Sequence, residues 1–120
     1  MSRGFETDDQ DLTVTSRREG DAAVVALDGE LTVFSSPMLR DRLREVVDAG
    51  PKRVVLDLSN VRYVDSSGVA TFVEALRLAR QAGGDMALAH VNPRVRGVLE
   101  IARLDTLFPI ADSVEEALNS

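Results

Sequence analysis

The chain has 120 residues, a hydrophobic fraction of 44% and a net charge of −6, which fits one globular domain with a single core. It contains no cysteine, so disulfides and thiolate chemistry are excluded. An acidic protein repels the phosphate backbone, and scattered arginines with one tyrosine and four phenylalanines offer no stacking platform, so direct nucleic-acid binding is not expected.

Membrane insertion and metal binding are not expected either. No stretch is long and apolar enough to span a bilayer, and the start at Met1 shows no signal peptide pattern. We therefore expect a cytoplasmic protein. No group of histidines and cysteines has metal-ligand spacing, so the sequence predicts no metal and no cofactor.

The chain begins with a polar segment followed by a hairpin. Residues 1–11 are acidic without periodicity and are predicted to form a flexible tail, whereas residues 12–120 form the domain. Alternation over residues 12–15 and an apolar run over residues 22–27 predict two antiparallel strands. Glu19-Gly20-Asp21 provides the turn between them.

The next segment is predicted to be an amphipathic helix. Ser36 is the expected N-cap and Pro37 the first helical residue, and Gly50-Pro51 ends the helix. Its apolar face is predicted to consist of Leu39, Leu43, Val46 and Val47.

A buried strand and a second helix follow. The nearly continuous apolar run over residues 54–58 predicts a strand covered on both faces. A loop is expected over residues 59–64, and a helix over residues 69–82 that ends at Gly83-Gly84. The apolar face of this helix is predicted to consist of Val69, Phe72, Val73, Leu76 and Ala79.

The remaining residues continue the alternation of strands and helices. A strand is predicted over residues 86–91, a helix from Asn92-Pro93, and a short edge strand over residues 107–110. Ser113 and Glu116 match a capping box that opens a last helix. This order predicts an α/β domain with a mixed sheet. The helix after Asn92-Pro93 is expected to direct Val95, Val98, Leu99 and Ala102 inward.

Two residues outside these patterns have a structural and a functional interpretation. Leu78 lies opposite the apolar face of its helix, as an ordinary exposed leucine or as a residue that contacts a partner. His90, the only histidine, lies inside a strand pattern, which favours a buried or edge structural role. A Ser–His–acid hydrolase site would require His90 to reach Ser66, and no other sequence signal supports one.

The turn Asp65-Ser66-Ser67-Gly68 separates the most apolar strand from the best amphipathic helix. The first N–H groups of a helix lack internal partners, and the helix dipole is positive there. Ser66 and Ser67 therefore suit the place as caps, and a phosphate suits it for the same electrostatic reason. The turn is interpreted either as a cap without further function or as a switch at which Ser66 gains and loses a phosphoryl group.

These residues carry a resemblance to a known family. Asp65-Ser66-Ser67-Gly68-Val69, preceded by the strand at residues 54–58 and by Val61-Arg62-Tyr63-Val64, resembles the signature of STAS domains. In particular it resembles the bacterial anti-sigma factor antagonists, also called anti-anti-sigma factors. Gly29-Glu30-Leu31 and Asn92-Pro93 fall where that family has similar residues. The likeness covers about residues 12–118.

The resemblance implies a fold and a function. The fold is a single STAS domain with a mixed four- to five-stranded sheet and helices packed mainly on one face. The function is not enzymatic: the unphosphorylated protein binds an anti-sigma factor and so frees the sigma factor. The anti-sigma factor is itself a serine kinase that uses ATP to inactivate the antagonist, and a metal-dependent serine phosphatase reverses the modification.

The resemblance also implies site residues. The phosphoacceptor of the family maps onto Ser66, and Ser67 maps onto the neighbouring Ser/Thr position and is a second candidate. The residues expected to bind the partner are Asp65, Ser66, Ser67, Gly68, Thr32 and Leu78.

One departure from the family pattern bears on this assignment. Many antagonists have Asp after Gly-Glu-Leu, where Thr32 stands here, close to the switch turn in the family fold. The change bears on which kinase is recognised and on whether the protein is a phosphorylated antagonist. The alternative is a STAS subunit of a phospholipid-transport ABC system, with a binding role on the cytoplasmic side of a membrane complex.

Overall fold

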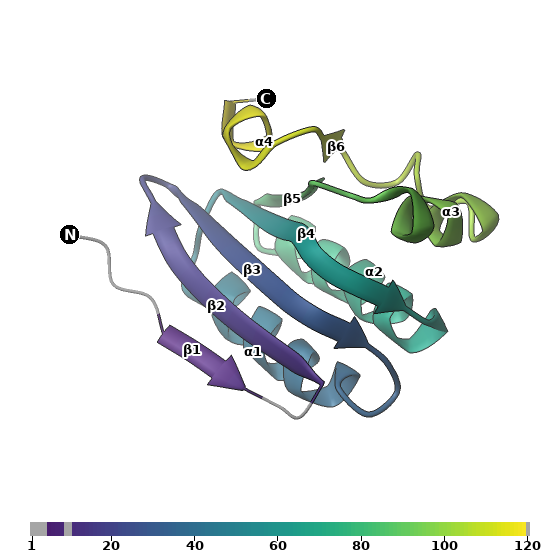
Figure 1. The fold of residues 1–120 in the computed structure, drawn as a ribbon. Helices are drawn as coiled ribbons and strands as arrows, with labels where there is room; N and C mark the ends of the chain where they lie inside the picture. The colour runs from purple at the N-terminus through teal and green to yellow at the C-terminus, as the bar shows by residue number, and fades with distance from the viewer. Residues whose placement is uncertain (1–4, 9–10, 120) are drawn as a thin grey trace.

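The computed structural model describes residues 5–8 and 11–119 of the chain, which form one sheet and four helices (Figure 1). The predicted α/β domain with a mixed sheet is confirmed. The elements are β1 (Phe5–Asp8), β2 (Leu12–Glu19), β3 (Ala22–Leu31), α1 (Ser36–Asp48), β4 (Arg53–Val64), α2 (Ser66–Gln81), β5 (Asp85–Ala89), α3 (Pro93–Ile101), β6 (Ile110–Ala111) and α4 (Val114–Asn119).

The strands lie in the sheet in the same order as in the chain, from β1 to β6. The β1–β2 and β2–β3 pairs are antiparallel, and the β3–β4, β4–β5 and β5–β6 pairs are parallel. Parallel neighbours need a long crossover, and α1, α2 and α3 supply the three crossovers. The antiparallel hairpin of β2 and β3 needs only a tight turn, in which Gly20 adopts a φ of +61°.

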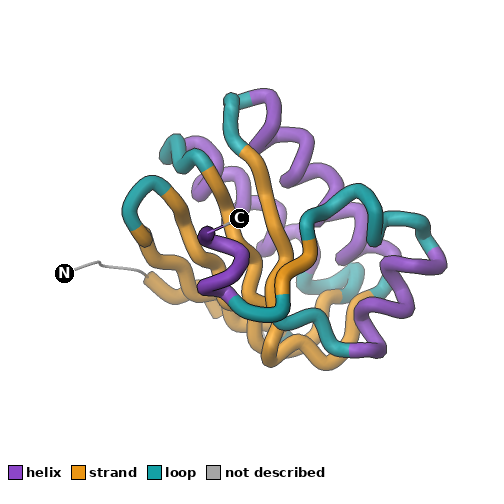
Figure 2. The backbone as a smooth tube through the Cα atoms, turned by 90° about the horizontal axis from the view of Figure 1, so that it is seen from above, coloured by secondary structure: helices purple, strands orange, loops and turns teal. Residues whose placement is uncertain are grey.

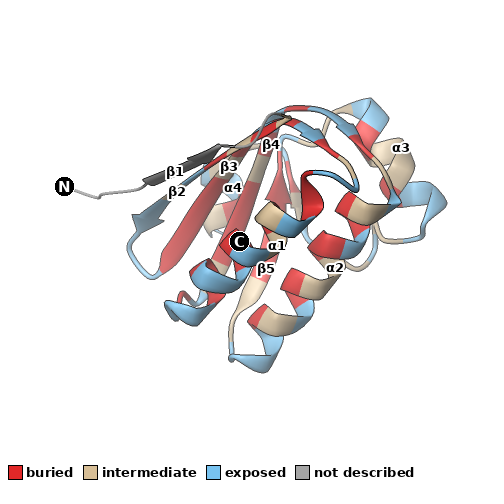
Figure 3. Cartoon of the chain, turned by 90° about the horizontal axis from the view of Figure 1, so that it is seen from below, coloured by how far each residue is buried: buried red, intermediate tan, exposed pale blue. Residues whose placement is uncertain are grey.

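The core has one layer on each face of the sheet. Helices α1 and α2 cover one face and contribute to the larger apolar cluster, which α3 joins, whereas α4 covers the other face (Figure 2). On β4, Val55 belongs to the smaller cluster and Leu56 to the larger one, and both residues are fully buried. Much of the central part of the sheet is coloured as buried in Figure 3. The prediction of a strand covered on both faces is therefore confirmed, as is the packing of helices mainly on one face.

The predicted helix faces are largely confirmed. All four residues predicted for the face of α1 are buried, and in α2 only Val73 is half-buried. In α3, Val95 and Leu99 are buried and Val98 is half-buried, whereas Ala102 is exposed because α3 ends before it.

Strand β4 is longer than predicted, because residues 59–64 continue it instead of forming a loop. Its neighbour β3 also runs on, and the two strands stay paired as far as Leu31 and Val64. Irregularities on either side of Asp28-Gly29 interrupt the regular alternation. Gly29 has a φ of +132°, and a Cβ there would lie 2.0 Å from the Asp11 carbonyl oxygen.

The sheet has one more strand in the described part of the chain than was predicted. Phe5–Asp8 pairs with β2, whereas the sequence placed these residues in a flexible tail. An edge strand is held by backbone hydrogen bonds to its neighbour, so it needs no alternation of apolar side chains. Residues 1–4 and 9–10 of the predicted tail lie outside the described residues. At the opposite edge, β6 begins at Ile110, three residues later than predicted.

Candidate functional site

The start of α2 is capped by Asp65. This residue has an extended backbone, and its Oδ1 accepts hydrogen bonds from the N–H groups of Ser67 at 2.8 Å and Gly68 at 3.2 Å. The prediction that Ser66 and Ser67 act as caps is wrong, because both have helical positions and the residue before them satisfies the free amides.

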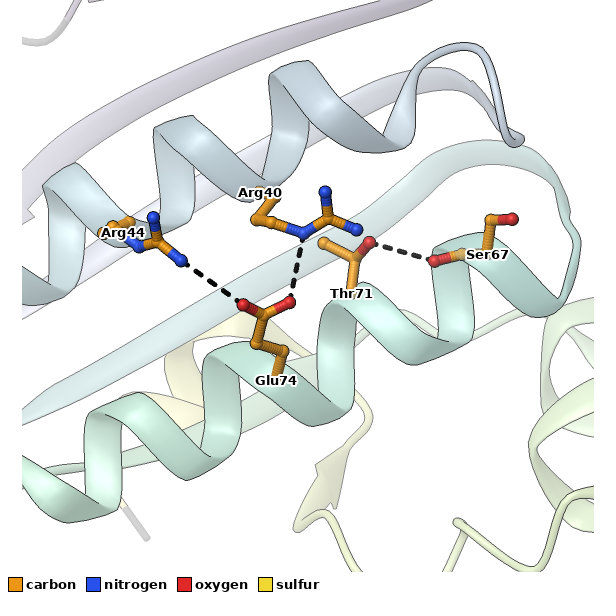
Figure 4. Close-up of polar contacts among 5 residues, drawn as sticks. All are labelled: Arg40, Arg44, Ser67, Thr71 and Glu74. Atoms are coloured by element: carbon orange, nitrogen blue, oxygen red, sulfur yellow. Dashed lines mark hydrogen bonds and ion pairs between the residues drawn. The ribbon is translucent and has the colours of Figure 1, made fainter.

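Ser66 is the first residue of α2, and its side chain is exposed. Within residues 5–8 and 11–119, no hydrogen bond involves its hydroxyl group. Ser67 is half-buried, and its carbonyl oxygen accepts a hydrogen bond from the Thr71 hydroxyl at 2.9 Å (Figure 4). The capping carboxylate thus leaves the Ser66 hydroxyl accessible to another molecule at the positive end of a helix.

The site lies where two neighbouring parallel strands end. The Asp65 N–H donates to the carbonyl oxygen of Leu31, the last residue of β3, at 3.0 Å. Gly68 is buried beside the same strand end. The turn after β4 and the loop after β3 are therefore adjacent in space, although they are more than 30 residues apart in sequence.

The loop between β3 and α1 is organised by Thr32. Its hydroxyl accepts from the Phe34 N–H at 3.1 Å, and its carbonyl oxygen accepts from the Ser36 N–H at 2.9 Å and hydroxyl at 2.7 Å. The N-cap position of α1 is Ser35 rather than the predicted Ser36. An aspartate at position 32 would offer an acceptor to the same Phe34 N–H, so threonine retains the local turn.

A hydrogen bond joins this loop to the start of α2. The Val33 N–H donates to Asp65 Oδ2 at 3.2 Å, so one carboxylate holds both segments. The side chains of Val33 and Phe34 are 58% and 80% exposed. Sequence reasoning missed both residues; the available signal was an apolar pair between a strand end and the helix start at Ser35-Ser36-Pro37.

Helices α1 and α2 are joined beside the site by a cluster of charges. Glu74 of α2 accepts from Arg40 Nε at 3.0 Å and pairs with Arg44 at 3.3 Å (Figure 4). Both arginines come from α1, so the cluster links the two helices at the surface.

Leu78 and His90 differ from their predicted environments. Leu78 is half-buried and packs against the larger apolar cluster, so the prediction of an exposed leucine is wrong. It lies one turn after Glu74 and therefore on the side of α2 that faces α1. His90 is exposed with a φ of +58° just after β5, rather than inside a strand. No hydrogen bond of the described residues joins His90 to Ser66, so a Ser–His–acid site has no support.

The described part of the chain offers neither a metal site nor a membrane span. Residues 5–8 and 11–119 contain no group of three or more histidine, aspartate or glutamate side chains placed to hold a metal ion. Among the same residues, none of the helices has the length and apolarity that crossing a bilayer requires.

Comparisons with known proteins agree with this architecture. The STAS domain model matches residues 13–117. An anti-sigma F factor antagonist of Paenibacillus polymyxa is 35% identical over 96 residues, which cover 79% of this chain and 82% of that protein.

Solved structures show the same fold. An anti-sigma factor antagonist from Mycobacterium paratuberculosis superposes with a TM-score of 0.83 at 24% identity, covering 90% of this chain and 92% of that one. The anti-sigma factor antagonist SpoIIAA in its unphosphorylated form has a TM-score of 0.77 at 21% identity, with 88% and 93% covered. SpoIIAA in its phosphorylated form has a TM-score of 0.70 at 19% identity, with 88% and 96% covered. The match over residues 13–117 shows that this chain belongs to the STAS domain family.

Proposed function

We propose that the chain is a cytoplasmic anti-sigma factor antagonist whose partner binding is switched off by phosphorylation of Ser66. The observation that carries the proposal is the exposed Ser66 hydroxyl at the first position of a helix that Asp65 already caps. The Paenibacillus relative, which is 35% identical, is named as an anti-sigma F factor antagonist. In this scheme the chain catalyses no reaction and is the substrate of its partner.

A phosphoryl group on Ser66 changes the surface more than the fold. It adds a charge of about −1.5 to −2, and the positive end of α2 offsets part of that charge. The cap hydrogen bonds from Ser67 and Gly68 go to Asp65, so they do not depend on the Ser66 hydroxyl. The domain can therefore keep its structure in both states.

The same charge opposes docking. Phosphoserine beside the Asp65 carboxylate concentrates negative charge, and a partner that covers this site has to desolvate it. A loss of about 3–4 kcal/mol of binding free energy corresponds to a few-hundredfold loss of affinity. One phosphate is therefore sufficient for an off-switch.

The partners follow from this chemistry. An anti-sigma factor with serine kinase activity binds ATP and the metal ion and provides the catalytic base. A serine phosphatase then removes the phosphoryl group and restores the Ser66 hydroxyl. Ser67 is a second phosphorylation candidate, although its side chain is half-buried. Thr32 lies in the loop tied to Asp65 through Val33, so we assign it to the surface that the kinase recognises.

The proposal is tested with purified chain, ATP, Mg²⁺ and the anti-sigma factor kinases of the source organism. We expect one kinase to add one phosphate to the wild type and to Ser67→Ala, and none to Ser66→Ala, as measured by intact-protein mass spectrometry. The unmodified chain should bind that kinase at least a hundredfold more tightly than the phosphorylated chain, a loss of about 2.7 kcal/mol.

Two results would contradict it. The first is a phosphate that persists in Ser66→Ala, and the second is equal affinity of the two forms for the kinase. Absence of any phosphate together with co-purification of a transporter ATPase would favour the phospholipid-transport alternative.

A further inference from the structure

The loop between β3 and α1 presents two adjacent apolar side chains to solvent. Phe34 is 80% exposed and Val33 is 58% exposed. Neither side chain belongs to the apolar clusters of the core. An exposed phenyl ring forgoes favourable burial, and with the neighbouring Val33 it forms a small apolar patch rather than a single exposed side chain.

The loop backbone is ordered although these side chains are exposed. The Thr32 N–H donates to Ser35 Oγ at 3.0 Å, the Val33 N–H to Asp65 Oδ2 at 3.2 Å and the Phe34 N–H to Thr32 Oγ1 at 3.1 Å. The Ser35 and Ser36 N–H groups both donate to the Thr32 carbonyl oxygen. A loop fixed in this way loses little conformational entropy when it docks.

The loop and the switch residue share one anchoring group. Asp65 Oδ1 holds the start of α2, where Ser66 is the first residue, and Asp65 Oδ2 holds Val33. The exposed apolar pair therefore has a defined position relative to the Ser66 hydroxyl. A partner that covers Ser66 is placed to contact the loop as well.

We propose that Phe34, supported by Val33, is the apolar anchor with which the chain docks into a pocket of its anti-sigma factor. The inference rests on the proposed function and specifies the chemistry of that partner. Aromatic side chains that fill a desolvated pocket dominate the binding energy of many interfaces. The pocket that receives this anchor is apolar.

The anchor also bears on the direction of the switch. An apolar pocket beside Ser66 excludes water, so that a phosphoserine loses part of its hydration when the partner docks. An anchor next to the switch residue thus explains how one phosphate prevents docking.

The test uses the anti-sigma factor kinase that phosphorylates Ser66 in the experiment above, without nucleotide, in isothermal titration calorimetry. We expect Phe34→Ala to weaken binding of the unmodified chain at least about thirtyfold, the loss typical of a central aromatic residue. Phe34→Leu should lose less, because it keeps apolar volume. Ile101→Ala is the comparison variant, since Ile101 is 87% exposed at the end of α3 and its neighbour Ala102 lines a cavity together with Ser66. Its affinity should fall far less than that of Phe34→Ala, as is typical of a contact outside the hot spot.

A kinetic readout separates docking from chemistry. In phosphorylation assays, Phe34→Ala should raise the KM for the chain and leave kcat at saturation unchanged, because Ser66 itself is intact. Each variant is first checked for an unchanged urea midpoint, which is expected because the ring of Phe34 is exposed.

Several outcomes would overturn the anchor and leave the proposed function standing. If Phe34→Ala bound the kinase with wild-type affinity while phosphorylation of Ser66 still abolished binding, Phe34 would not be the anchor. Equal losses in Phe34→Ala and Ile101→Ala would show non-specific apolar adhesion instead of a pocket. Wild-type dimers that Phe34→Ala disrupts in sedimentation velocity, with unchanged kinase affinity, would assign the loop to a second copy of the chain. The proposed function fails separately if the chain phosphorylated at Ser66 binds the kinase as tightly as the unmodified chain does.

Discussion

Gly68 of α2 packs directly against Leu31 at the end of β3: a Cβ placed on Gly68 would lie 2.8 Å from the Leu31 Cβ and 3.0 Å from Val64 Cγ1. Real side chains do not approach so closely, so only glycine lets the helix start lie on the ends of the two strands. Helix position and the orientation of the site therefore depend on a missing methyl group.

Gly68→Ala is predicted to destabilise the domain by about 1–3 kcal/mol, the usual cost of overpacking a core. The matched control is Gly97→Ala in α3, because a Cβ there would meet nothing within 4 Å. The free energy of unfolding of that variant should instead rise by about 0.5–1 kcal/mol, because alanine loses less backbone entropy than glycine on folding. Urea denaturation measures the free energy of unfolding of both variants. An unchanged value for Gly68→Ala would show that Leu31 and Val64 move aside without cost.

Removal of the cap should be far more costly than removal of the exposed hydroxyl. Asp65→Ala loses the acceptor of the Ser67 and Gly68 N–H groups and is expected to lose about 1–2 kcal/mol. Ser66→Ala should change the free energy of unfolding by less than about 0.5 kcal/mol, as is usual for surface positions. The prediction is contradicted if chemical denaturation finds the two variants equally destabilised.

Asp65→Asn should separate the two tasks of this side chain. Asparagine caps helices as well as aspartate does, so Oδ1 can keep its contacts with α2. The amide group that replaces Oδ2 cannot accept from the Val33 N–H. We expect the Val33 amide to exchange with solvent faster in this variant while the Val69 amide keeps its wild-type rate. Hydrogen exchange followed by NMR measures the rates of both amides. An unchanged rate for Val33 would show that its hydrogen bond to Asp65 does not protect the loop.

Both the oxygen and the nitrogen of the Asn92 side-chain amide are predicted to stabilise the domain. Oδ1 caps α3 by accepting from the Val95 N–H at 2.8 Å, and Nδ2 donates to the Val61 carbonyl oxygen of β4 at 2.8 Å. Asn92→Asp keeps the cap and loses the donor, which should cost about 1–2 kcal/mol through one lost hydrogen bond and repulsion between oxygens. Asn92→Ala loses both bonds and should be the less stable variant in urea denaturation; the reverse order would count against this assignment.

The charge cluster of Glu74 should contribute little stability and depend on salt. Arg40 and Arg44 are partly exposed, so Glu74→Gln is expected to lose only about 0.2–1 kcal/mol. The difference from the wild type should shrink in about 1 M salt, where charges are screened within ~3 Å. Thermal melts at low and high salt test this, and a loss that is independent of salt would point to packing instead.

The order and type of the elements could be predicted because apolar periodicity reports them directly. The faces of α1 and α2, and the coverage of β4 on both sides at Val55 and Leu56, follow from that periodicity. The extension of β4 through residues 59–64 could not be predicted in this way, because it depends on pairing with β3 across an irregular register. Backbone pairing of this kind leaves no regular side-chain pattern.

The sequence indicated where the candidate site lies, but not which of its residues caps the helix. The sequence identified Asp65 and Ser66 together, but which of them caps the helix depends on where the helix begins. Leu78 was assigned to the surface from the face of one helix, although its neighbour α1 covers that side. Val33 and Phe34 have no periodic neighbours, so their exposure becomes visible only once the loop is placed beside α2.

The capping bonds that Asp65 accepts from Ser67 and Gly68 also determine what a round of modification would leave behind. A helix whose end is secured by a neighbouring residue returns to the same shape when the phosphoryl group is removed, with no refolding step. If Ser66 is phosphorylated as proposed, the chain can pass through many such rounds, and the rate of the response is set by the enzymes that act on it, because the fold is the same after each round.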